Sequence, residues 1–74
     1  MIALLDLLAE MSGCPWISDL KKPDLLGRIY SSAQSIDDDR YSVSEWVYAL
    51  SYIFDCELNF SSVQEAKEYL KKAV

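Results

Sequence analysis

The chain is 74 residues long, which leaves room for one small domain, and its seven Lys plus Arg against twelve Asp plus Glu give a formal net charge of −5. It contains no His, which excludes imidazole catalysis and metal sites that need a His ligand, and its acidity argues against binding to nucleic acid or to anionic membranes. Apolar residues form 51% of the chain, which is typical of a folded domain.

The first predicted helix covers residues 2–12. Its apolar residues recur at the spacing of one buried helix face, and they are Leu4, Leu5, Leu8 and Met11. Gly13 and Pro15 form a stop signal, because Gly accepts the left-handed conformation after a helix and Pro cannot continue one. Residues 14–22 are then predicted to form a connection that packs Trp16, Ile17 and Leu20 against the core.

The second predicted helix covers residues 23–36. Pro23 suits its first position, where a missing backbone N–H costs nothing. Its apolar stripe consists of Leu25, Leu26, Ile29, Ala33 and Ile36. The three consecutive Asp residues at 37–39 end this segment and predict a solvated turn.

The third predicted helix, over residues 43–54, has the clearest start in the chain. Ser42 and Glu45 form a capping box, in which the Ser hydroxyl accepts from a backbone N–H and the Glu carboxylate returns a bond to the cap. Tyr41 and Trp46 occupy the positions of a hydrophobic staple over the same turn. The apolar face that follows is the widest in the chain, so this helix is predicted to be central to the fold.

Residues 56–60 alternate apolar and polar side chains, and we interpret them as a loop with one side packed, because no partner strand is present. Overlapping capping boxes at Ser61 and Ser62 begin a fourth predicted helix over residues 62–72. Val63, Ala66, Leu70 and Ala73 are expected to point inward. The sequence therefore predicts an all-α fold, a compact bundle of four short helices within a single domain over residues 1–74.

Three residues on the third helix are the candidate partner-binding residues, namely Glu45, Tyr48 and Tyr52. They form one stripe beside the buried face, and Tyr is favoured at interfaces because it buries an apolar ring and keeps a hydroxyl for a partner. The alternative is that both tyrosines only cover the edge of a small core. Residues around Trp16 could extend the patch, although Trp16 and Trp46 are both expected to be core residues.

A second interpretation rests on a resemblance. The stretches Ala49-Leu50-Ser51-Tyr52-Ile53-Phe54-Asp55-Cys56-Glu57-Leu58 and Ser62-Val63-Gln64-Glu65-Ala66-Lys67-Glu68-Tyr69-Leu70 are similar to the end of the second helix and the start of the last helix of acyl carrier proteins. The resemblance implies that Ser42 would bear the phosphopantetheine arm. The chain has Tyr41-Ser42-Val43 where that family has Asp-Ser-Leu, and the segment joining the two stretches is shorter than the family's.

The main functional prediction is a protein–protein interaction module that binds a heterologous partner or a second copy of itself. No nucleophile–base pair, phosphate loop or metal-ligand pattern is present, so no enzymatic activity, metal or cofactor is predicted. The alternatives are the carrier-like domain modified on Ser42 and an acidic inhibitor or immunity-type protein that blocks a basic toxin. With no export signal evident, Cys14 and Cys56 are expected to be reduced thiols and the protein cytoplasmic.

Overall fold

The computed structural model describes residues 2–14 and 16–74, and in this part of the chain it contains helices and turns but no strand. The prediction of an all-α bundle with four short helices is confirmed. Two short 3₁₀ helices lie between the first two α-helices. In chain order the elements are α1 (Leu4–Met11), η1 (Ile17–Lys21), η2 (Pro23–Leu25), α2 (Leu26–Ser35), α3 (Val43–Phe54) and α4 (Val63–Ala73).

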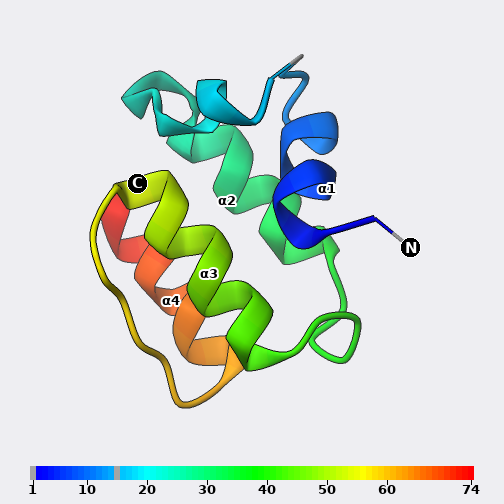
Figure 1. Ribbon diagram of the computed structural model, residues 1–74, viewed down its shortest axis with the longest axis vertical. Coiled ribbons are helices and arrows are strands. Elements are labelled where there is room, and N and C mark those ends of the chain that lie inside the picture. The colour runs from blue at the N-terminus through cyan, green and yellow to red at the C-terminus, as the bar shows by residue number, and fades with distance from the viewer. Residues whose placement is uncertain (1, 15) are drawn as a thin grey trace.

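The four α-helices surround one core. α1 packs on α2 and α3, and α4 packs on the same two helices, so that α1 and α4 complete opposite sides of the bundle (Figure 1). α3 and α4 run in the same direction, because the extended connection between them travels back along the length of the bundle (Figure 1). None of the helices in the described residues is long and apolar enough to cross a membrane.

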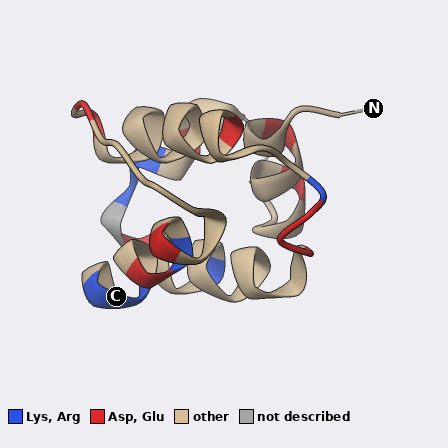
Figure 2. Cartoon of the chain, turned by 90° about the horizontal axis from the view of Figure 1, so that it is seen from below, with Lys and Arg blue, Asp and Glu red and all other residues tan. Residues whose placement is uncertain are grey.

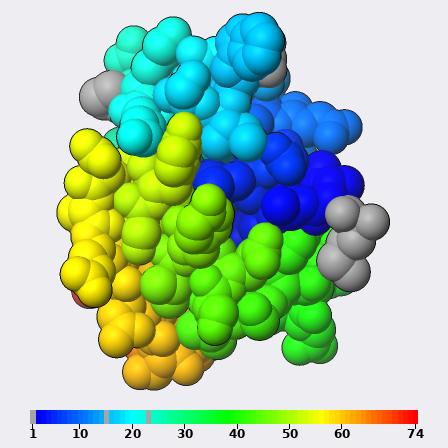
Figure 3. Space-filling model, viewed as in Figure 1, coloured from blue at the N-terminus to red at the C-terminus, as the bar shows by residue number. Residues whose placement is uncertain are grey.

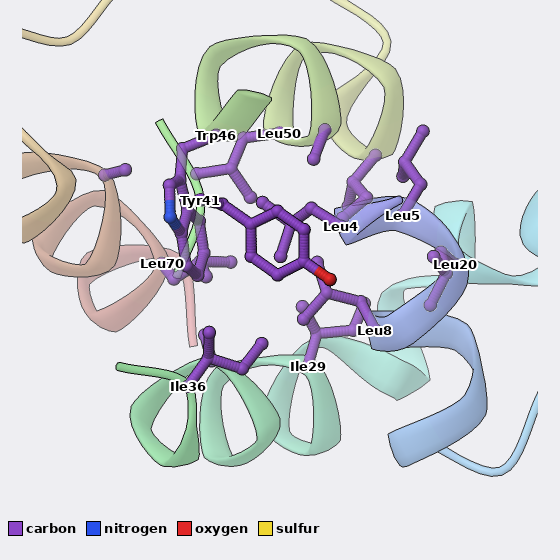
Figure 4. Close-up of a cluster of buried hydrophobic side chains, with 14 of the residues drawn as sticks. Leu4, Leu5, Leu8, Leu20, Ile29, Ile36, Tyr41, Trp46, Leu50 and Leu70 are labelled. Atoms are coloured by element: carbon purple, nitrogen blue, oxygen red, sulfur yellow. The ribbon is translucent and has the colours of Figure 1, made fainter. Parts of the chain in front are cut away.

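The largest side chain in the core is Trp46, which is completely buried. Every α-helix and η1 contribute a large apolar side chain that packs in the same cluster (Figure 4). Burial of these side chains supplies most of the stabilisation, because each short helix would be marginal alone. The fully buried large residues besides Trp46 are Leu4, Leu8, Leu20, Ile29, Leu50 and Leu70.

Three expectations about burial are wrong. Trp16 is 71% exposed and Met11 is 42% exposed, and Ala73 is also exposed. Met11 is the last residue of α1, and the chain turns away directly after it through Gly13, whose φ is +76°. Trp16 precedes η1, and the residue of η1 that is buried in the core is Leu20. Ala73 lies in the last turn of α4.

The second predicted helix begins differently from the expectation. Its first turn, Pro23–Leu25, is a 3₁₀ helix, and the α-helical part covers only Leu26–Ser35. Ile36 has an extended backbone and still reaches the core, as the apolar stripe predicted. The change of helix type does not disturb the buried face, because Ile29 and Ala33 are completely buried.

The boundaries of α3 agree with the prediction. At its start, the Ser42 hydroxyl accepts a hydrogen bond from the backbone N–H of Glu45 at 3.2 Å. At its end, Asp55 adopts the left-handed conformation with φ of 53°, and the N–H of Cys56 donates to the carbonyl of Ser51 at 3.2 Å. In the loop after α3, Leu58 and Phe60 pack against the core as expected, whereas Cys56, the other apolar member of the alternation, is exposed. The N–H of Leu58 donates to the Ser51 hydroxyl at 3.1 Å.

Lys67 of α4 ties the turn after α2 to the bundle. Its ammonium donates to the carbonyl of Ile36 at 2.6 Å and to Oδ1 of Asp38 at 2.7 Å. It also lies 5.7 Å from the ring centroid of Trp46, which is within the range of a cation–π contact. The Asp run is therefore not only a solvated turn, because Asp38 forms an ion pair with a side chain that is only 12% exposed.

Lys67→Met is expected to lower the free energy of unfolding by about 1–3 kcal/mol, because it removes two charge-assisted hydrogen bonds and leaves a partly buried carbonyl without its donor. Lys71→Met is the matched control, since Lys71 is exposed in the last turn of the same helix and makes no ion pair with a described residue. Urea unfolding followed by circular dichroism measures both variants. Equal losses would contradict the structural role given to Lys67.

Candidate interaction surface

The candidate partner-binding residues lie on the side of α3 that turns away from the core. Tyr48 is the most exposed of them at 65%, whereas Glu45 and Tyr52 are half-buried. In the space-filling view α3 crosses the middle of the molecular face, with α1 and the segment around η1 beside it (Figure 3). We define the α3–η1 face as the outer surface of α3 that bears Glu45, Tyr48 and Tyr52 together with the adjoining residues 16–21.

Tyr52 is held by the end of η1. The ammonium of Lys21 lies 4.6 Å from the centroid of the Tyr52 ring and 3.7 Å from Oδ1 of Asp55. These contacts anchor η1 along the C-terminal half of α3. Tyr52 is therefore partly engaged within the molecule, and Tyr48, one helical turn earlier, is the more exposed of the two tyrosines.

Glu45 has a structural role that the sequence did not reveal. Its Oε2 accepts a hydrogen bond from the backbone N–H of Leu4 at 3.1 Å, so it caps the first turn of α1 instead of returning a bond to Ser42. No side chain within α1 caps that helix, and a carboxylate at a helix N-terminus is stabilised by the helix dipole. A second hydrogen bond connects the start of α3 with the segment before α1, since the Tyr41 hydroxyl donates to the carbonyl of Ile2 at 2.7 Å. Glu45 thus forms the border of the α3–η1 face next to α1.

Trp16 adds an exposed aromatic side chain at the other end of η1 from Lys21. The sequence predicts Trp16 in the core, and it lies in a connection outside any regular apolar stripe. Trp16 directly precedes η1, and η1 packs on α3, the helix that bears Tyr48. Large exposed aromatic side chains are enriched at protein interfaces.

Ser42 is exposed, and its hydroxyl forms the N-cap of α3. This contact accounts for the residue without any modification. The carrier interpretation stays a prediction, and a mass increase after incubation with coenzyme A and a permissive phosphopantetheinyl transferase is the observation that would support it.

Ser42→Ala is expected to lower the free energy of unfolding by about 1 kcal/mol, because a backbone N–H of the first turn loses its acceptor. Ser42→Asp is expected to keep most of the stability, since Asp caps a helix as well as Ser does. Ser44→Ala, two residues away inside the helix, is the control. Thermal unfolding followed by circular dichroism distinguishes them, and an unchanged Ser42→Ala variant would contradict the capping role.

A second surface feature, which the sequence analysis did not identify, is a cleft between the loop after α3 and α4. We call it the aromatic cleft. Its volume is about 260 Å³, and its lining includes the apolar or aromatic residues Leu58, Phe60 and Tyr69 and the charged residues Glu65, Glu68 and Lys72. The only sequence signal was the alternation over residues 56–60, which indicated a packed side but not a cavity.

A larger groove of about 410 Å³ lies between α2 and α4 and is predominantly polar. Lys67 and Asp38, which line it, are already paired with each other. Cys14 and Cys56 are free thiols, the first half-buried and the second exposed. Among residues 2–14 and 16–74, no group of three Cys, Asp or Glu side chains is placed to hold a metal ion.

Comparisons with known proteins identify no relative. No family model matches the chain, and neither a curated protein nor a solved structure is significantly similar to it.

Proposed function

We propose that this chain is a protein-binding module that uses the α3–η1 face and has no catalytic activity. The observation that carries the proposal is the exposure of Tyr48, which is 65% exposed in the middle of a helix whose other large apolar side chains are buried or half-buried. A Tyr ring on a rigid helix offers a large contact area and loses little conformational entropy on binding.

The surroundings of Tyr48 favour a protein as the bound species. The α3–η1 face holds the acids Glu45 and Asp55 at its borders and the aromatic Trp16 at one end. A centre of exposed aromatic side chains with a polar rim is the usual anatomy of a protein interface. The neighbouring acids do not converge on a nucleophile, and the sequence supplies no His as a general base.

The charge of the molecule favours a basic partner. Acidic side chains are distributed around several elements of the bundle (Figure 2), and the net charge is −5. Such a field raises the association rate with a cationic surface and lowers it with another acidic one. A second copy of the chain carries the same charge, so self-association would require the apolar contacts to exceed this repulsion.

Light scattering on a size-exclusion column, over concentrations from micromolar to millimolar, tests the proposal first. A dimer that dissociates on dilution assigns the α3–η1 face to a second copy, and Tyr48→Ser must then shift the equilibrium towards the monomer. A monomer at every concentration leaves the face unclaimed by a second copy, and pull-down experiments for a different protein then follow. A dimer that is insensitive to Tyr48→Ser contradicts the use of this face.

A further inference from the structure

The aromatic cleft has a composition that differs from the α3–η1 face. Tyr69 lies between two other rings, with its centroid 5.1 Å from that of Phe54 and 5.6 Å from that of Phe60, both in edge-to-face geometry. All three rings are half-buried, so the cluster fixes the cleft and leaves aromatic surface open to solvent. The aromatic lining of the cleft is therefore preformed, because each of these rings is held by its contacts with the others.

The polar lining of the cleft includes a carboxylate without a partner. The carboxylate of Glu68 makes no hydrogen bond or ion pair with any other residue in the described part of the chain. Glu65, one turn earlier on α4, uses one carboxylate oxygen to accept from the N–H of Ser61 at 3.3 Å and keeps the other oxygen. The lining thus combines aromatic rings with these two carboxylates and one cation, Lys72, on the same helix.

We propose that the aromatic cleft receives an arginine side chain from a basic partner protein. A guanidinium is planar, stacks on aromatic rings and binds a carboxylate through two parallel N–H groups, which matches an aromatic wall beside Glu65 and Glu68. The aliphatic stem of arginine would cover Leu58 and Phe60. The volume of about 260 Å³ fits one side chain and is below the roughly 300–1,000 Å³ of small-molecule sites.

The inference rests on the proposed function, because the proposed function is binding to a basic protein and the inference names the side chain by which that protein binds. The surface concerned is the aromatic cleft and not the α3–η1 face. The net charge of −5 supports it, since a basic partner is attracted before any specific contact forms. Glu68 also lines the groove between α2 and α4, but that groove is the weaker site for such a group, because it holds Lys67 and Lys71 and its only aromatic lining residue is Tyr30 among the described residues.

Nuclear magnetic resonance titration of the isotope-labelled chain with a Gly-Arg-Gly peptide, acetylated and amidated at its ends, tests the inference. Matched peptides carry citrulline or lysine in place of arginine. The expected result is a saturable change in the amide signals of the loop and α4 around Phe60 and Tyr69, with arginine binding roughly fivefold or more tightly than citrulline. Lysine is expected to bind more weakly than arginine, because it lacks the planar fork.

Two variants that change the net charge equally distinguish binding at the cleft from non-specific electrostatic attraction to the acidic chain. Glu68→Gln is expected to lower the affinity for the arginine peptide about threefold or more. Glu10→Gln, which changes an exposed acid on α1, is expected to leave the affinity for this peptide unchanged. Equal effects of the two variants, equal binding of citrulline or lysine, or the absence of saturable changes at the cleft would each overturn the inference. The peptide does not require Tyr48, so this result is independent of the test of the α3–η1 face.

Discussion

Trp46→Ala is expected to lower the free energy of unfolding by about 3–5 kcal/mol, the usual cost of deleting a buried aromatic side chain. The indole is completely buried, and it contacts a core built from all four α-helices. A domain of this length is expected to have a total stability of roughly 4–11 kcal/mol. The variant is therefore expected to lose a large share of its stability.

Trp16→Ala is the matched control, because it deletes the same side chain at a position that is 71% exposed. Its expected effect is within about 0.5 kcal/mol. Trp46→Phe should lie between the two, since the smaller ring fills part of the space and the buried Nε1–H of Trp46 has no hydrogen-bond acceptor among the described residues to lose. Urea unfolding of the unmodified protein and the three variants gives the order of their free energies of unfolding. Equal losses of this free energy for the two Ala variants would contradict the core described above.

Tyr48→Ser is expected to weaken binding of the partner by about 2 kcal/mol, or roughly 30-fold, which is typical of an aromatic residue at the centre of an interface. Its free energy of unfolding should change little, because the ring is mostly exposed. Tyr52→Ser is expected to weaken binding and also to destabilise the fold modestly, since the ring contacts Lys21. Isothermal titration calorimetry measures the affinity, and thermal unfolding measures stability.

Tyr30→Ser provides the control for this prediction. It makes the same chemical change on α2, which packs on α1 and α4 and lies across the bundle from α3. If Tyr30→Ser lowers the affinity as much as Tyr48→Ser while both proteins remain folded, the α3–η1 face is not the binding surface. Unchanged binding of the Tyr48→Ser, Tyr52→Ser double variant would lead to the same conclusion.

Local signals predicted the regular elements well. α3 begins and ends where the cap at Ser42 and the end of its apolar pattern placed it, and α4 begins at the cap formed by Ser62. Such signals depend on residues within one or two helical turns, so they can be recognised without knowing the fold. The same applies to the buried positions of α2 and α3, which follow the helical period.

Contacts between distant residues could not be predicted. Glu45 looked like half of a local capping box, but its carboxylate caps α1, forty-one positions away in the sequence. No local pattern singles out Lys67, and its ammonium binds the turn after α2. In both cases the partner lies far away in the sequence, and the parallel course of α3 and α4 has no local signal at all.

Site-specific photo-cross-linking most directly tests the claim that α3 presents a protein-binding surface. A photoreactive phenylalanine analogue replaces Tyr48 in one protein and the exposed Gln34 of α2 in another, and both are irradiated in cells of the organism that encodes the chain. The expected result is one discrete adduct from position 48, with the mass of the 8.4 kDa chain plus that of a partner or of a second copy, and none from position 34. No adduct at position 48, or the same adduct at both positions, would contradict it.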